Sequence, residues 1–278
     1  MCAAGRLSFV TVLALAAAGA SAQSIYWVDY DFENSRDRFS LHRSDLDGGN
    51  RREVLHDMGL QPQYASLEVF GDRIYWIDFN NRPVAATLDG VLLGPTEPTD
   101  PQVYARLYDR PINAAGTQTY FPGRNNAGQL EDILRGDFEY ENPVVLVPTR
   151  EFSPNVSIVL DEANGHIYWA GAWGGGDTGL IQRANLADGS DARTLVEGFA
   201  MDDFTVDLAL DVAGGKMYWG NHSRFKIQRA NLDGSGVEDV VTDTYVFGMT
   251  VDPRPVPEPA GGVVLLAAGS LLARRRRR

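Results

Sequence analysis

The strongest constraint on the fold of this chain is an aromatic pair that recurs at a nearly constant interval. The pair occurs five times, at Tyr26-Trp27, Tyr75-Trp76, Tyr120-Phe121, Tyr168-Trp169 and Tyr218-Trp219. The steps between successive tyrosines are 49, 45, 48 and 50 residues. A period of about 40–50 residues with strand-like sequence is typical of β-propeller blades. We therefore predict an all-β fold, a single β-propeller of four-stranded blades, with five blades and six as the alternative.

Each repeat reads as four short strands joined by turns. An apolar segment that ends in Asp, as in 157–161 and 207–211, precedes a Gly-containing turn and the Tyr-Trp strand. A third strand and an Asp-Gly turn follow, and Asp-Gly favours the positive φ of tight hairpins. The first Tyr-Trp strand lacks a preceding strand, whereas residues 247–252 supply one after the last repeat. We expect these N- and C-terminal strands to share one blade and so to close the ring.

The repeated pattern resembles a known propeller family. Leu-Asp, Gly, Ile-Tyr-Trp and Leu-Asp-Gly recur in this order between residues 25 and 252, as in the YWTD propellers of low-density lipoprotein receptors. This sequence departs from that family where Thr-Asp would follow Tyr-Trp, for example at Val28-Asp29 and Ile77-Asp78, and its period is longer. The resemblance implies a YWTD-like propeller.

The N-terminus has the layout of a secretory signal peptide over residues 1–22. Arg6 gives a positive start, residues 7–20 are uncharged and largely apolar, and Ala20-Ser21-Ala22 forms a small-x-small cleavage pattern. Cleavage is expected between Ala22 and Gln23. A buried core helix is the alternative for this segment.

The C-terminus, residues 254–278, has a charged end after a short apolar stretch. A Pro-Glu-Pro triplet precedes the uncharged residues 260–273, and five arginines end the chain; the residues are Pro257, Glu258, Pro259, Arg274, Arg275, Arg276, Arg277 and Arg278. This layout resembles the PEP-CTERM sorting signal, which implies recognition by an exosortase, a membrane-embedded protease. The arginines should stay in the cytoplasm. Residues 260–273 would span only ~21 Å as a helix, short of the ~30 Å hydrocarbon core, which suits a temporary membrane tether. A simple tail anchor is the alternative.

Composition narrows the chemistry of the remaining domain, residues 23–253. The only cysteine is Cys2, so the mature chain has no disulfide, thiol nucleophile or cysteine zinc ligand. Between residues 23 and 259, 19 basic residues face 37 acidic ones, a formal charge of −18. Such a surface repels nucleic acid and anionic polymers, so we expect no nucleic-acid partner.

Three features of the sequence are candidate sites. Polar groups stand seven residues before four of the repeat tyrosines, and a fifth fills the same place in the shared blade: Glu68, Asn113, Asp161, Asp211 and Asp252. They are expected to cap their own hairpins, with a cation or catalytic site at a channel mouth as the alternative. Trp173, next to three glycines, is either a loop-packing aromatic or an exposed stacking platform. Residues 45–50 resemble a calcium loop, but Asp-Gly turn chemistry explains them, so calcium is the one cofactor kept open.

These features predict an exported protein of the cell envelope or extracellular matrix. We expect a non-enzymatic binding or scaffold module with no catalytic residues and no metal site. Its partners would be the exosortase-type protease, the membrane before processing, and extracellular polysaccharide or another envelope protein. The alternative is an extracellular propeller enzyme, a glycosidase or a metal-assisted lactonase acting on polysaccharide or small lactones.

Overall fold

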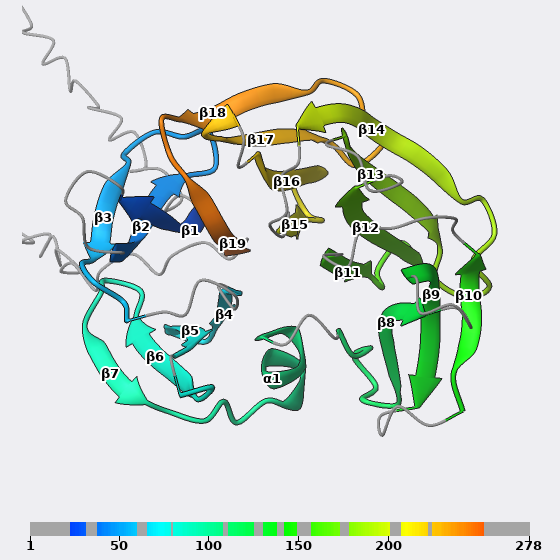
Figure 1. Cartoon of the computed structure of the whole chain (residues 1–278), viewed down its shortest axis with the longest axis horizontal. Helices are drawn as coiled ribbons and strands as arrows, with labels where there is room; N and C mark the ends of the chain where they lie inside the picture. The colour runs from blue at the N-terminus through cyan, green and yellow to red at the C-terminus, as the bar shows by residue number, and fades with distance from the viewer. Residues whose placement is uncertain are drawn as a thin grey trace, which may run out of the picture. The chain divides into compact units, whose positions relative to one another are not determined.

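Five antiparallel sheets surround a central axis as the blades of a β-propeller (Figure 1). The computed structural model describes residues 23–31, 38–59, 66–78, 80–107, 111–124, 130–137, 142–148, 157–172, 178–200, 207–221 and 224–252. The predicted signal peptide and sorting tail lie outside these residues. Within the described part, no helix is both long and apolar enough to cross a membrane.

Each blade is listed from its innermost to its outermost strand. Blade 1 consists of β19 (Val246–Asp252), β1 (Ser24–Asp31), β2 (Arg38–Asp45) and β3 (Arg52–Leu55). Blade 2 consists of β4 (Glu68–Phe70), β5 (Arg73–Ile77), β6 (Pro83–Thr87) and β7 (Leu92–Pro95). Blade 3 consists of β8 (Gln118–Arg124), β9 (Leu130–Asp137) and β10 (Val144–Pro148). Blade 4 consists of β11 (Ser157–Asp161), β12 (His166–Ala172), β13 (Thr178–Asn185) and β14 (Arg193–Ala200). Blade 5 consists of β15 (Leu208–Asp211), β16 (Lys216–Asn221), β17 (Lys226–Asn231) and β18 (Glu238–Thr242).

The two ends of the domain close the ring, as the sequence predicts. β19 pairs antiparallel with β1, with Ser24 opposite Asp252 and Tyr26 opposite Thr250. The backbone N–H of Met249 also donates to Oδ2 of Asp207, at the start of the innermost strand of blade 5, over 2.8 Å. The last strand is therefore bonded to blade 1 and to blade 5, and the prediction of five blades with a shared first blade is confirmed.

Blade 3 departs from the predicted four strands. The described residues give it three strands and a single bridge, from Ile112 to Thr119, where an innermost strand would run. Pro111 has no N–H to donate to a ladder, which limits pairing there. A short helix, α1 (Pro101–Leu107), precedes the bridge. Proline suits the first turn of a helix, where its missing N–H costs no hydrogen bond.

The Tyr-Trp pairs fill the seams between blades. Successive side chains of a strand point to opposite faces of its sheet. Each tyrosine accordingly packs toward the following blade and each tryptophan toward the preceding one: Tyr168 belongs to the core shared with blade 5, and Trp169 to the core shared with blade 3. The four tryptophans of the pairs are at most 1% exposed. Burying such a side chain contributes roughly 2–3 kcal/mol before entropy losses. These aromatics are therefore core residues that hold neighbouring blades together.

A second repeated contact joins the blades at the Asp-Gly turns. Gly48, Gly90, Gly189 and Gly234 all have positive φ, between 71° and 89°. Each lies against a backbone carbonyl of the outermost strand of the preceding blade, so that an added Cβ would overlap that oxygen; at Gly90 the oxygen belongs to Val54. Glycine is therefore required at each turn for two reasons, the positive φ and the close approach of the carbonyl oxygen. We call the four blade interfaces with this contact the glycine seams.

The interface between blades 2 and 3 is built differently, and we call it the helix seam. Here Tyr75, Ile77 and Ala85 of blade 2 pack against Val103 and Leu107 of α1. The two helix residues are four positions apart and lie on one face of α1. Helix α1 thus occupies the place where the other interfaces bring two sheets together (Figure 1).

Candidate binding site in the central channel

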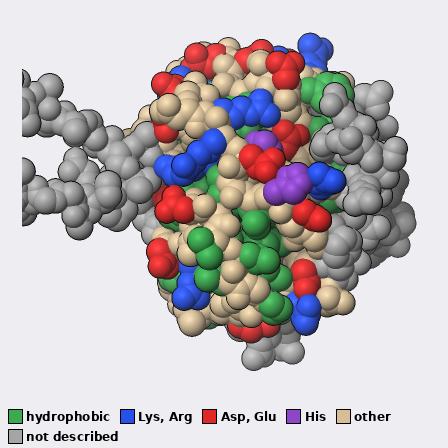
Figure 2. Space-filling view, turned by 90° about the vertical axis from the view of Figure 1, so that its left-hand side faces the viewer, with side chains coloured by type: hydrophobic (Ala, Val, Ile, Leu, Met, Phe, Trp, Pro, Cys, Tyr) green, Lys and Arg blue, Asp and Glu red, His purple; other side chains and the backbone are tan. Residues whose placement is uncertain are grey.

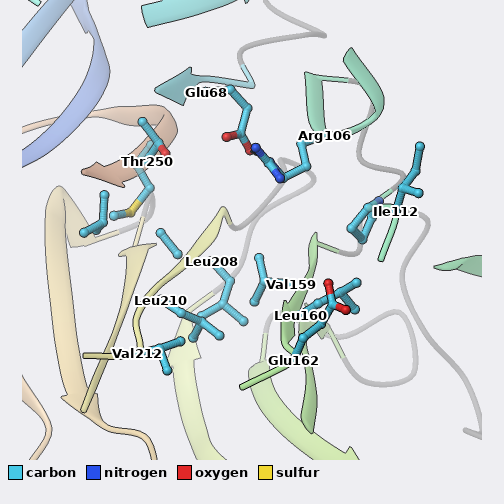
Figure 3. Close-up of a pocket in the computed structure, with 14 residues that line it drawn as sticks. Glu68, Arg106, Ile112, Val159, Leu160, Glu162, Leu208, Leu210, Val212 and Thr250 are labelled. Carbon is cyan, nitrogen blue, oxygen red and sulfur yellow. Dashed lines mark ion pairs between the residues drawn. The ribbon is translucent and has the colours of Figure 1, made fainter. Parts of the chain in front are cut away.

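The innermost strands surround a cavity of about 230 Å³ on the ring axis. Its walls are largely aliphatic and include Val159, Leu160, Leu208, Leu210 and Val251. Figure 3 shows Val159, Leu160, Leu208 and Leu210 on one side of two groups of opposite charge that point toward one another, Glu68 and Arg106. An apolar cavity with a few convergent polar groups is the usual form of a small-molecule site.

Strand register, rather than distance from the tyrosine, decides which polar residues reach the cavity. Glu68 pairs with Tyr75, as Val159 pairs with Tyr168 and Ala209 with Tyr218. Asp161 instead pairs with His166, and Asp211 with Lys216, two residues before the tyrosine. The residue of blade 2 at that position is the half-exposed Phe70, opposite Arg73.

The sequence-based alignment of Glu68 with the other four polar residues is therefore wrong. The hairpin of blade 2 has two residues, Gly71 and Asp72, between its strands, whereas four residues separate Asp161 from His166. The residue seven positions before the tyrosine is therefore the last residue of the strand in blade 4, at Asp161. In blade 2 it lies two positions before the last residue of the strand, at Glu68. In the structure Glu68 belongs to the cavity wall, not to the turns.

The polar residues outside the cavity bond within their own hairpins. Oδ1 of Asp161 accepts the backbone N–H of Asn164 over 3.1 Å, and Oδ1 of Asp211 accepts that of Gly214 over 2.8 Å. Oδ1 of Asn113 accepts the N–H groups of Thr117 and Gln118. Asp252 is buried at the end of β19. Among the described residues, no group of three or more His, Cys, Asp or Glu side chains is placed to hold a metal ion.

The ion pair between Glu68 and Arg106 joins blade 2 to helix α1, at the helix seam. Nε of Arg106, on α1, lies 3.0 Å from Oε1 of Glu68, and their side chains are 32% and 18% exposed. Burial raises the pKa of Glu68, and the opposite charge and hydrogen bond of Arg106 only partly offset this. A carboxyl group inside an apolar cavity loses hydration when it ionises, which is the cause of the raised pKa.

The second acidic group of the cavity, Glu162, is already engaged. Its Oε1 accepts the backbone N–H of Ala114, in the hairpin of blade 3, over 2.6 Å. Figure 3 shows Glu162 on the side of the cavity near Ile112, away from Glu68. The two carboxyl groups therefore hold different parts of the ring, and the cavity offers a ligand apolar walls with one ion pair.

Two other sequence candidates have different outcomes. Trp173 lies outside the described residues, so its role stays a prediction. In the segment that resembles a calcium loop, Oδ1 of Asp47 accepts the N–H of Gly49 over 2.9 Å, and the N–H of Gly48 bonds to the carbonyl of Asp45. These are the hydrogen bonds of a tight turn.

Sequence reasoning missed Arg106 and helix α1. The available signals were Pro101 directly after Asp100 and the apolar spacing of Val103 and Leu107. Both signals are short, and the regular strand repeat on either side favoured another strand.

On the side of the ring that carries β3 and β7, acidic, basic and apolar side chains are intermixed (Figure 2). The apolar ones include Val91, Leu92 and Leu93, which are 61%, 54% and 43% exposed. Among the described residues on this side, Lys and Arg side chains are scattered between acidic and apolar ones.

Fold and cavity together define a five-bladed β-propeller with a narrow, mainly apolar channel. Over 84 residues the chain is 40% identical to Low-density lipoprotein receptor-related protein 1 of Pyricularia oryzae; these residues are 29% of this chain and 27% of that protein. The chain thus spans about a quarter of the length of this relative. The match supports the resemblance of the repeats to low-density lipoprotein receptor propellers. No family model matches the chain.

Solved structures of similar fold come from proteins of several kinds. A chain of the nidogen/laminin complex is 14% identical, with a TM-score of 0.40, over 83% of this chain and 98% of that one. A putative 6-phosphogluconolactonase from Bacteroides fragilis is 10% identical, with a TM-score of 0.41, over 83% and 98%. A gluconolactonase from Xanthomonas campestris is 13% identical, with a TM-score of 0.37, over 82% and 80%. None of these similarities assigns a ligand or an activity to this chain.

Proposed function

We propose that the chain is an exported β-propeller that acts as a binding or scaffold module of the cell envelope or extracellular matrix, without catalysis. An exosortase-type protease would remove its tail after export. The observation that carries this proposal is the sequence on either side of one propeller: residues 1–22 have the layout of a signal peptide, and residues 257–278 have the Pro-Glu-Pro, apolar and arginine segments of a sorting signal.

The channel supports a binding role over a hydrolytic one. A glycosidase needs two carboxyl groups that face one bond, about 5–10 Å apart. Here Glu68 is paired with Arg106, and Glu162 is bonded to the hairpin of blade 3. Both carboxyl groups are thus engaged in contacts within the ring.

Mass spectrometry of the protein isolated from its native envelope tests the sorting step. We expect a mature N-terminus at Gln23 and no peptide that contains Arg274–Arg278. Recovery of the intact arginine tail from a host with an active exosortase would exclude the proposed processing.

A second candidate, a hydrolase, is favoured by one observation: the pKa of Glu68 is raised inside a cavity, as in many catalytic acids. A glycan array read with and without calcium separates the two functions. We expect binding without release of shorter products. Turnover that the substitution Glu68→Gln abolishes would establish the enzyme instead.

A further inference from the structure

A cluster of aromatic rings outside the Tyr-Trp repeat extends from Phe225 of blade 5 onto blade 1, where three of its rings pack against the core shared with blade 2. It consists of Tyr30, Phe39, Phe225, Tyr245 and Phe247, which we call the aromatic platform. The rings of Phe225 and Tyr245 are 5.5 Å apart, and Tyr245 contacts both Tyr30 and Phe247 at 5.9 and 5.4 Å. Phe39 packs behind them, 4.8 Å from Tyr30 and 5.0 Å from Phe247. Four separate segments of the chain therefore contribute to one aromatic cluster, in which Phe39 is buried and Phe225 is the exposed ring.

The outermost ring of the platform is held in an unfavourable backbone conformation. Phe225 has φ of 54° and is 50% exposed. Six of the seven described non-glycine residues with positive φ are Asn or Asp, which tolerate this region, and Phe225 is the seventh. A bulky residue with positive φ costs free energy that Asn or Gly would not. Such strain at an exposed aromatic points to a role other than stability.

A buried hydrogen-bond network fixes this conformation. The carbonyl of Phe225 accepts the N–H of Thr244 over 3.1 Å. Oγ1 of Thr244 accepts from Nε1 of Trp27 and donates to Oδ2 of Asp29, each over 2.7 Å. Oδ1 of Asp29 accepts the N–H of Tyr245 over 2.9 Å. The same carboxylate and hydroxyl therefore hold the backbone at Phe225 and Tyr245 in place before any ligand arrives.

The size and surroundings of the platform narrow the class of ligand. One half-exposed ring is far smaller than the roughly 800 Å² that each partner buries in a stable protein interface. The exposed Arg224 and Asp243 are the chain neighbours of Phe225 and Thr244, so polar residues flank Phe225 and Thr244 in the sequence. The C–H face of a sugar ring packs on an aromatic ring while its hydroxyls bond to polar groups at the rim. The formal charge of −18 over residues 23–259 disfavours an anionic chain.

We propose that the aromatic platform binds a neutral glycan, with one sugar ring stacked on Phe225 and Tyr245. This inference rests on the proposed binding function and names its site and ligand class.

The test uses the mature chain and a panel of neutral hexasaccharides of glucose, mannose, galactose and N-acetylglucosamine, with alginate oligosaccharides as the anionic arm. Isothermal titration should detect binding to a neutral member and none to alginate. Phe225→Asn keeps a residue that tolerates positive φ but removes the ring, so affinity should fall about tenfold. Its melting temperature should not fall, because backbone strain is relieved. Phe70→Asn, which removes an exposed phenylalanine of blade 2, is the matched control and should leave affinity unchanged.

Each other outcome has a definite meaning. Glycan binding that survives Phe225→Asn overturns the platform but leaves the binding function standing. Absence of binding to every neutral member overturns the platform, while the sorting step is still judged by the mass of the mature protein. A lower melting temperature of Phe225→Asn would identify Phe225 as a packing residue and overturn the proposal. Self-association lost in Phe225→Asn would do the same and identify a second copy as the occupant.

Discussion

The four glycine seams and the helix seam solve the same packing problem in different ways. At a glycine seam, two sheets meet through Tyr and Trp side chains, and an Asp-Gly turn rests on the carbonyl of the preceding blade. At the helix seam, α1 stands between the sheets, and a charged pair replaces the close backbone contact. Regular seams give the ring its shape, and the irregular one places an ion pair in the channel.

Deletion of Gly248–Asp252 should give the largest effect, because it removes five of the seven residues of β19 rather than one contact. β1 would lose its ladder partner, and Asp207 of blade 5 would lose the N–H of Met249. We expect the melting temperature to fall by on the order of 10 °C or more, or cooperative unfolding to be lost. Circular dichroism melts of the mature chain measure this. Truncation after Arg254 is the control and should change little; an equal melting temperature in both truncations would contradict closure by β19.

Substitution of a seam glycine should lower the free energy of unfolding, and the loss should be larger where the added Cβ meets a backbone carbonyl. Gly90→Ala brings a methyl group onto the carbonyl of Val54 and also requires alanine at φ of 89°. We expect a loss of about 3 kcal/mol in the free energy of unfolding. Gly71→Ala is the matched control, since Gly71 has φ of 64° but no atom within 4 Å of the added Cβ, so only about 1 kcal/mol should be lost. Denaturant titrations compare the two, and equal losses would show that the seam contact contributes nothing.

Sequence periodicity predicts the glycine seams well and the helix seam poorly. The Tyr-Trp spacing and the Asp-Gly turns predict the number of blades and the four-stranded repeat, because each blade has the same local structure. Helix α1 is not repeated, so no second copy reveals it. The sequence-based register of Glu68 is wrong for a related reason. The hairpin at Gly71 is shorter than those of blades 4 and 5, so the seven-residue count back from the tyrosine does not apply to blade 2. Pairing across a seam, such as Glu68 with Arg106, depends on three-dimensional arrangement that a repeat does not encode.

Asp161 tests the turns of a regular blade. Its carboxylate accepts the backbone N–H of Asn164 and the side-chain amide of the same residue over 2.9 Å. Asp161→Ala should cost about 1 kcal/mol, because a partly buried donor loses its acceptor. Asp161→Asn retains an acceptor for the backbone N–H and should cost less than about 0.5 kcal/mol. Thermal unfolding with and without calcium checks both variants. A saturable stabilisation by calcium that either substitution abolishes would reveal a shared cation site instead.

The pH dependence of stability at Glu68 is the smallest predicted effect and the most diagnostic. Its sign distinguishes a carboxyl group that burial destabilises from an ordinary stabilising salt bridge. Burial raises the pKa of Glu68 in the folded chain above its unfolded value of about 4.3. A raised pKa means that the folded state holds its proton more tightly. The stabilising contribution is therefore complete below about pH 4.3 and is lost as the pH rises through the folded pKa. Glu68→Gln is neutral throughout and lacks this dependence.

The free energy of unfolding should consequently fall, relative to Glu68→Gln, as the pH rises from 4 to 8. The difference should stay below about 1 kcal/mol, since Arg106 offsets part of the desolvation and is itself a third exposed. Urea titrations at several pH values measure it, with the exposed Glu97→Gln as the control. A wild-type chain that instead gains stability over Glu68→Gln with rising pH would show that the ion pair outweighs desolvation. The helix seam would then be held by its charges, rather than by the packing of Tyr75 and Ile77 against α1.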